Sequence, residues 1–469
     1  MSKKNQNYTN RKQNRFHPER MRGNVFVNNS GKQWLPEENG RAAKVERLLR
    51  GLEKKEIAGN MAGYKDSGIE YIGQVPKDWE VLRLKNISNI YAAKEYLFGE
   101  WPVEKNGKPY SPFGEWSSGN EVIITGRVGT IGQYEMLEKN PKKKILINDN
   151  RLLIRPFTED YRKKALSHFL FWAMAIVNLN DIITGSAVPL ITATSLLKKR
   201  IVVPPLSEQQ RIADFLDTKC GILDRTIDAV SQQIEDLEKY KKALITKTVT
   251  KGIYKKGEPE RAMKDSGVEW IGEVPEEWDV KRNSLNFDIR KTLVGENWSN
   301  MQLLSLTTNG VKNITIDDQV GKRPKTLATY QIAHKNDIVM CLFDLDASAV
   351  FSGLCKKNGI ISPAYKLLKC KNGMFPPYAE YYFRAVFDGR KYKKYAKSIR
   401  YTISTNDFMH LKMPVPPLAE QQQIADYLDE KCKNINNRVQ KRRQQLEWLK
   451  EYKKSLIFDY VTGKKRVEK

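Results

Sequence analysis

Two stretches of the chain carry apolar residues at alternating steps of three and four positions, from Ile212 to Leu244 and from Ile424 to Leu456. A mean period of 3.5 residues is typical of a coiled-coil seam, and a helix with such a stripe needs a partner. The shared pattern therefore predicts two long helices that pair with each other. The ten positions expected to form the seam are Leu216, Leu223, Ile227, Ile234, Leu237, Leu428, Ile435, Val439, Leu446 and Leu449.

The predicted helices cover residues 206–251 and 418–462, and each begins at the leucine of the same Pro-Pro-Leu sequence. Proline cannot donate to a strand ladder, so the preceding strand should stop there. Ser207 with Gln210 fits a capping box, whereas Ala419 lacks the capping hydroxyl in the second helix. About 40 residues at a rise of 1.5 Å would form a rod of roughly 60 Å.

Two long core helices of one globular domain are the alternative interpretation. The polar faces of both helices are rich in Lys, Glu, Gln and Asp, which favours a solvated rod. Lys241, Lys453 and Arg442 fall on the expected seam, where they should weaken it locally and set its register.

The chain also contains an internal repeat. Residues 65–79 match residues 264–278 at ten of fifteen positions with an offset of 199, and residues 203–220 match residues 415–432 at fourteen of eighteen with an offset of 212. The second offset continues without a gap through the following helix. Between the repeated blocks the halves share almost nothing and differ in length, so a constant scaffold carries two unlike inserts that perform two versions of one task.

Each insert has the pattern of a mixed α/β domain. Strands are expected at 121–125, 145–147 and 151–155 in the first insert and at 337–343 in the second, with helices near 165–178 and 378–387. The expected fold class is α+β: two mixed α/β domains separated by a pair of long antiparallel coiled-coil helices, with a pseudo-two-fold internal repeat. The expected divisions are 1–60 (extension), 61–205 (first domain), 206–251 (helix), 252–263 (linker), 264–417 (second domain), 418–462 (helix) and 463–469 (tail).

Charge then narrows the choice of partner. Lys and Arg number 81 against 55 Asp and Glu, giving a net charge of +26 and a pI near 9.6. This excess favours a polyanion as the partner, with nucleic acid first and an anionic membrane surface second; a generically basic protein is the alternative.

The five cysteines include no CxxC pair, which suggests reduced thiols. The first thirty residues lack an apolar stretch and the longest apolar run has nine residues, so a cytoplasmic protein is expected.

Basic and amide residues gather in the expected loops of both inserts. Single charge runs usually mark a solvated face, but those interleaved with tyrosines suit phosphate clamping plus contact with base edges. The glycines at 126–132 lack any phosphate-cradling spacing and favour a tight turn that projects Arg127. The candidate DNA-binding residues are Arg127, Thr130, Lys142, Lys143, Asn150, Arg151, Ser186, Lys322, Arg323, Lys325, Arg400 and Tyr401.

No catalytic or metal-binding residue is assigned. The nearest match to the Asn/Asp/Ser-Pro-Pro-aromatic motif of amino-group DNA methyltransferases is Phe375–Tyr378, whose first residue lacks the required acceptor. The sequence has no cofactor-binding glycine motif, no Walker lysine motif and no convincing carboxylate cluster. Asp344 and Asp346 lack a second acidic or His cluster, which favours turn and cap roles over a metal pair.

The repeated motifs resemble the specificity subunit of Type I restriction–modification systems. The residues that carry the resemblance are YKDSGIEYIGQVPKDW at 64–79 with its copy at 264–278, PPLSEQQRIADFLD and PPLAEQQQIADYLD with the helices that follow, and NDIVMCLFDLDASAV at 336–350 with ISPAY at 361–365. The resemblance covers about residues 61–469. Residues 1–60 depart from it, and are either an extra DNA- or partner-binding arm or translated upstream sequence.

The resemblance implies that each insert is a target-recognition domain that reads one half of a bipartite, asymmetric site in double-stranded DNA. It also implies two methyltransferase (modification) subunits docked on the helices, and motor-nuclease (restriction) subunits that join them. No cofactor is expected on this chain, whereas S-adenosylmethionine, ATP and Mg are expected on the partner subunits. A self-contained nuclease or methyltransferase and a coiled-coil scaffold that never touches DNA are the competing hypotheses.

Overall fold

The computed structural model describes residues 63–92, 122–125, 131–136, 151–158, 163–185, 189–253, 257, 259, 261–308, 310–315, 326–345, 351–396 and 401–468. Contacts divide the chain into two compact units, Met1–Lys77 and Asp78–Lys469, and each is described by itself. Among the described helices, none combines the length and apolar character needed to cross a bilayer.

The first repeated block forms a small antiparallel hairpin in the first unit. Strand β1 (Tyr64–Asp66) pairs with β2 (Gln74–Pro76). Gly68 has φ +65° and donates its N–H to the Asp66 carboxylate at 2.9 Å, so glycine permits the turn. In the second unit, β9 (Met263–Asp265) and β10 (Glu273–Pro275) repeat this pairing, and Gly267 has φ +64°. The repeated sequence therefore folds into the same local structure twice.

Both inserts begin and end on neighbouring strands. Strand β3 (Glu80–Arg83) pairs antiparallel with β8 (Arg200–Val203), and β11 (Asp279–Arg282) pairs in the same way with β20 (Lys412–Val415). Each insert therefore leaves the scaffold and returns to it at one place.

The first insert is built on one antiparallel sheet with the strand order β4-β7-β5-β6. Helix α2 packs against β5 and β6 of this sheet, and its Phe171 ring lies 5.3 Å from the Tyr134 ring of β6. The described elements of this insert are the 3-10 helix η2 (Leu84–Asn86), β4 (Ser88–Ala92), β5 (Val122–Thr125), β6 (Tyr134–Met136), β7 (Arg151–Pro156), α2 (Ser167–Met174), the 3-10 helix η5 (Asn180–Ile182) and α3 (Ala193–Leu197).

The described residues of the second insert form two four-stranded sheets, in the orders β12-β19-β16-β17 and β14-β13-β18-β15. Its sheets comprise β12 (Phe287–Arg290), β13 (Leu303–Thr307), β14 (Gly310–Ile314), β15 (Gln331–Ala333), β16 (Ile338–Met340), β17 (Ser352–Leu354), β18 (Gly359–Ile361) and β19 (Lys366–Cys370). Its helices are α5 (Asn283–Asn286), η6 (Gly295–Asn300), α6 (Pro376–Asp388), η7 (Lys391–Lys394) and α7 (Thr405–His410). Of the strand expected at 337–343, only Ile338–Met340 (β16) pairs in a sheet.

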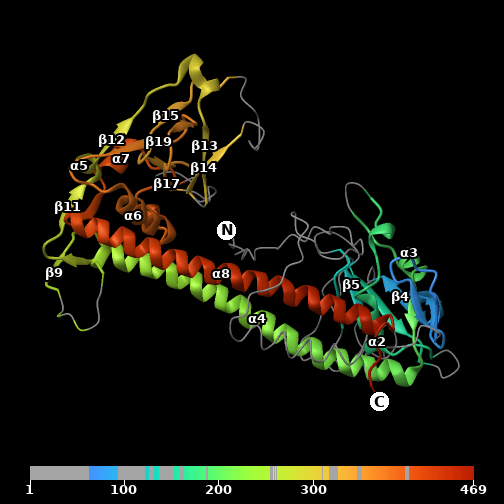
Figure 1. Ribbon diagram of the computed structural model, residues 1–469. Coiled ribbons are helices and arrows are strands. Elements are labelled where there is room, and N and C mark those ends of the chain that lie inside the picture. Colours follow the sequence, from blue (N-terminus) through green and yellow to red (C-terminus); the bar gives the residue numbers. More distant parts are fainter. Residues whose placement is uncertain are drawn as a thin grey trace, which may run out of the picture. The chain divides into compact units, whose positions relative to one another are not determined.

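The long helices α4 (Leu206–Lys251) and α8 (Leu418–Val461) run antiparallel to each other, as Figure 1 shows. The Lys453 Nζ of α8 lies 2.6 Å from the Asp224 carboxylate of α4, and the Lys241 Nζ of α4 lies 2.8 Å from the Asn436 amide oxygen of α8. At the ten seam positions no side chain is exposed, and five are buried. The antiparallel pair of long helices and the mixed α/β class are confirmed.

Two local expectations on these helices are wrong. Pro205 and Pro417 are the N-caps and have extended backbones, so the helices begin directly at Leu206 and Leu418. Ser207 is therefore already helical and forms no capping box, and Gln210 bonds Asp214 instead. Arg442, expected on the seam, is exposed and donates to Gln445 on its own helix at 2.7 Å.

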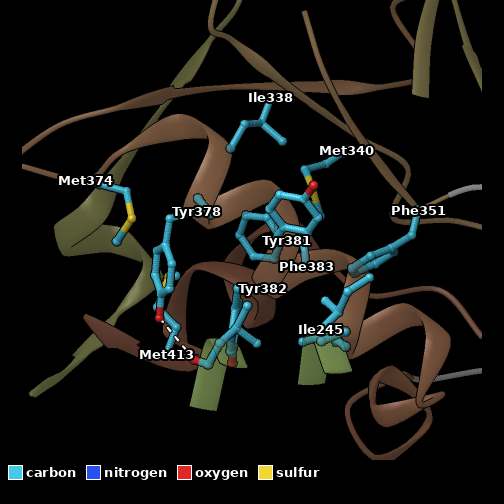
Figure 2. Packing of buried hydrophobic residues seen from close by; sticks show 14 of the residues in the cluster. Ile245, Ile338, Met340, Phe351, Met374, Tyr378, Tyr381, Tyr382, Phe383 and Met413 are labelled. Atoms are coloured by element: carbon cyan, nitrogen blue, oxygen red, sulfur yellow. Dashed lines mark hydrogen bonds between the residues drawn. The ribbon is translucent and has the colours of Figure 1, made fainter. Parts of the chain in front are cut away.

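The core of the second half joins helix α6 to the scaffold. Figure 2 shows the aromatic side chains of α6, among them Tyr378 and Phe383, grouped between Met340 of β16 and Ile245 of α4. Helix α6 contacts both α4 and α8. The hydroxyl of Tyr378, fully buried, donates toward the carbonyl oxygens of Pro414 (3.0 Å) and Val249 (3.2 Å). The Pro-Pro-Tyr sequence thus starts a core helix.

Candidate nucleic-acid interface

A basic 3-10 helix and a tyrosine meet at one edge of the second domain. The Nζ of Lys393 in η7 lies 4.6 Å from the ring centroid of Tyr401, within the range of a cation–π contact. Lys391 lies 5.9 Å from the Trp270 ring, and Lys394 forms an ion pair with Glu269. Of the candidate DNA-binding residues, Tyr401 is therefore placed among basic side chains of the kind that contact phosphates.

The backbone around Tyr401 is held in an uncommon conformation. Tyr401 has φ +48° and Asp344 has φ +49°, values that non-glycine residues rarely adopt. The Leu345 N–H donates to the Tyr401 carbonyl at 3.4 Å, and the Ile403 N–H donates to the Leu342 carbonyl at 2.8 Å. The hydroxyl of Tyr392 in η7 donates to the Leu345 carbonyl at 3.2 Å. Backbone positions of this kind often lie at functional sites, and the contact of Tyr401 with DNA stays a prediction.

The other candidate DNA-binding residues are placed only in part. Arg151 begins strand β7, and its side chain lies outside the described part of the structure. The candidates that lie wholly outside the described residues are Arg127, Thr130, Lys142, Lys143, Asn150, Ser186, Lys322, Arg323, Lys325 and Arg400. Their assignment to DNA binding stays a prediction.

A tryptophan–glutamate hydrogen bond ties each domain to the first turn of a long helix. Trp79 donates its indole N–H to the Glu208 carboxylate at 3.0 Å, and Trp278 donates to Glu420 at 2.9 Å. Both indoles are fully buried. A carboxylate in the first turn also interacts favourably with the helix dipole. The two halves thus carry one anchor at equivalent positions.

A buried glutamine forms the second anchor in each half. The Gln209 amide accepts from the Leu166 N–H at 2.8 Å and donates to the Lys164 and Pro204 carbonyls at 2.8 and 2.7 Å. In the second half, Gln421 accepts from the Phe375 N–H at 2.8 Å. These bonds fix the segment that leads into α2 or α6 against the long helix.

An aspartate eight residues further along each helix, just over two turns away, forms the third anchor. The indole N–H of Trp172 in α2 donates to Asp217 of α4 at 2.9 Å. The hydroxyl of Tyr381 in α6 donates to Asp429 of α8 at 2.6 Å. Different donors from two unlike domains therefore bind the same carboxylate position of the repeated helix.

Sequence reasoning missed these anchors, although a signal for them existed. Glu208, Gln209 and Asp217 each recur in the second copy at an offset of 212. Polar residues kept between two copies within one chain are expected to have partners. A partner in the insert was not predictable, because Trp172 and Tyr381 have no common sequence context.

Two buried cysteines of the described residues are poor nucleophiles. Burial raises the pKa of the Cys220 thiol to about 11 and that of Cys355 to about 12, so both stay protonated at neutral pH and are poor nucleophiles. Among the described residues, no group of three His, Cys, Asp or Glu side chains could hold a metal ion.

Glu380 in α6 should give the second domain a pH-dependent stability. Burial raises the pKa of this carboxyl to about 7, and its Oε2 atom is inaccessible and has no hydrogen-bond partner among the described residues. Because the folded state then holds a proton that the unfolded state releases above about pH 4.5, stability should fall as pH rises from about 4.5 to 7. Urea unfolding across this range should show that decline, and E380Q should flatten it. An unchanged slope in E380Q would contradict the assignment.

Comparisons with known proteins agree with this architecture. The family model of the Type I restriction modification DNA specificity domain matches residues 76–239 and 308–447, once in each half. The Type I restriction enzyme MjaVIII specificity subunit of Methanocaldococcus jannaschii is 24% identical over 84% of this chain and 95% of its own length. The putative MjaX specificity subunit of the same organism is 24% identical over 85% of this chain and 96% of its own length.

A solved structure supports the fold. One chain from a study of complex assembly and conformational transition of the type I R-M system covers 83% of this chain and 99% of its own length, with a TM-score of 0.56 and 15% identity. The resemblance noted in the repeated motifs is confirmed. Because the two family matches span more than half of its residues, this chain belongs to the Type I restriction modification DNA specificity family.

Proposed function

We propose that this chain is the DNA-sequence-recognition subunit of a Type I restriction–modification complex, in which each insert domain reads one half of a bipartite, asymmetric site. One observation carries the proposal. Two unlike domains are fastened by the same three anchor positions, Glu208, Gln209 and Asp217 and their copies, to two antiparallel helices. A scaffold that repeats while its inserts differ suits one task performed on two different sequences.

The geometry of the helices suits this task. The 46 residues of α4 extend about 69 Å at 1.5 Å per residue. Half-sites one helical turn of DNA apart are separated by about 34 Å, which is within that reach. Two readers on a rigid spacer convert two modest half-site affinities into one stronger bivalent interaction. The net charge of +26 supplies attraction to the phosphates.

The same proposal covers catalysis, cofactors and partners. The chain itself is non-catalytic and directs two modification subunits, which bind S-adenosylmethionine, to adenines in the bound halves. Motor-nuclease subunits, which use ATP and Mg, join for restriction. The support is the family membership and the absence of a recognisable catalytic motif in the sequence.

Binding of the isolated chain to duplex DNA should be weak and should fall steeply with salt. If the two domains together neutralise about six phosphates or more, the affinity should drop by about a thousandfold between 50 and 200 mM salt. Fluorescence anisotropy with a labelled duplex, titrated at several salt concentrations, measures this slope.

Two results would contradict the proposal. The absence of binding at any salt concentration would favour a scaffold that never touches DNA. Turnover by the purified chain alone, with Mg²⁺ or with S-adenosylmethionine, would identify it as a self-contained nuclease or methyltransferase.

A further inference from the structure

In the second half of the chain, one arginine binds the glutamate of the Trp278–Glu420 hydrogen bond at the start of α8. Arg261 lies in the segment before β9, and its guanidinium donates to both oxygens of Glu420, at 2.6 and 3.1 Å. It also donates to Glu277 at 2.9 Å and lies 5.9 Å from the Trp278 ring centroid. Arg261 therefore braces the carboxylate that accepts the Trp278 indole N–H.

The first half has the same arrangement, but its arginine comes from the other end of the chain. Arg466, five residues beyond the end of α8, donates to the Asp78 carboxylate at 2.6 Å. Its Nε lies 3.8 Å from the Glu208 carboxylate, which accepts the Trp79 indole N–H. Glu208 is buried, so a positive charge beside it offsets part of its desolvation cost.

The repeat shows that these two contacts correspond. Asp78 and Glu277 share the offset of 199, and Glu208 and Glu420 share the offset of 212. The arginines do not correspond, because the offset of 199 aligns Arg261 with Ala62. The first copy therefore lacks an arginine of its own at the position that braces the second copy.

We propose that Arg466 is a positioning residue for the first recognition domain: the C-terminal tail supplies the arginine that the first copy lacks. It bridges Asp78, next to the anchoring tryptophan, and Glu208 at the start of α4. The orientation of the first domain, and with it the reading of one half-site, then depends on the last residues of the chain. The functional part of this inference rests on the proposed DNA recognition.

The contact between Arg466 and Glu208 is weaker than the contact between Arg261 and Glu420. Arg261 bonds Glu420 through two nitrogens, whereas Arg466 reaches Glu208 only at 3.8 Å. The side chain of Arg466 is 48% exposed, against 35% for Arg261. Bidentate, less exposed ion pairs are the stronger kind, so the first domain is the more easily loosened.

The test compares R466M with R261M as a matched control, each in the full chain assembled with its modification subunits. Binding is measured to a duplex with both half-sites and to duplexes with one half-site scrambled. In R466M, the loss of affinity caused by scrambling the half-site of the first domain should shrink about tenfold. The loss caused by scrambling the half-site of the second domain should stay as in the wild type. R261M should show the reverse. R466K should recover part of the wild-type penalty that R466M loses, because lysine keeps the positive charge but lacks the forked guanidinium geometry.

A second measurement separates this inference from the proposed function. Amide hydrogen exchange of the assembled protein without DNA should become faster in R466M at β3 and the first turns of α4, and stay unchanged at β11 and the first turns of α8. D78A, an exposed substitution that removes the acceptor of the same 2.6 Å contact, should reproduce the change if R466M folds poorly. Equal changes in both halves, or none in either variant, would overturn the role of Arg466 even if the protein reads DNA as proposed. Failure of all duplexes to bind, with half-selective exchange intact, would instead count against the proposed function alone.

Discussion

Replacing Gln421 by leucine is expected to lower the free energy of unfolding of the second half by about 2–4 kcal/mol. The wild-type amide accepts from the Phe375 N–H at 2.8 Å and donates to the Pro416 and Gly373 carbonyls at 2.9 and 3.3 Å. Gln421 is 1% exposed, so water cannot replace these bonds. Leucine has a similar volume and leaves the Phe375 N–H and the Pro416 carbonyl without the partner they had.

The neighbouring Gln422 provides the matched control, because it is exposed on the same helical turn. Q422L should change stability by less than about 0.5 kcal/mol. Urea unfolding followed by tryptophan fluorescence measures both variants. In the first half, Q209L should act like Q421L, and Q210L, also exposed, like Q422L. Equal stability of Q421L and Q422L would show that the buried glutamine does not fasten the domain to α8.

Exchanging residues 80–202 for the insert of another family member is expected to change one half of the recognised DNA sequence completely and to leave the other half unchanged. The structure makes such a graft self-contained, because Glu80 and Val203 are paired residues of neighbouring strands β3 and β8. The anchors Glu208, Gln209 and Asp217 lie outside the exchanged segment and are supplied by the scaffold. The helix pair is untouched, so the spacing between the half-sites should also persist.

The scaffold was largely predictable from the sequence, because its signals are local and occur twice. The seam positions follow from a 3.5-residue period, and that period depends only on the helix geometry. The capping box at Ser207 was predicted wrongly, because Pro205, with its extended backbone, is the N-cap and Ser207 already lies inside the helix. Arg442 was placed on the seam by its register, but a charged side chain at that position stays in water.

The inserts were less predictable, because their contacts join residues far apart in the chain. The parallel pairing of β13 with β18 and the bond from Trp172 to Asp217 have no local sequence signal. The role of Arg466 was hidden for the same reason, since its partner Asp78 is 388 positions away. Of the candidate DNA-binding residues, only Tyr401 is fully described, and its positive φ could not be foreseen from its neighbours.

Methylome sequencing of a host that carries the 80–202 exchange tests the central claim most directly, which is that two separately anchored domains each read one half-site. The account predicts a methylated motif with one new half, one original half and the original spacing. A motif in which both halves change, or in which the original half is lost, would contradict the account.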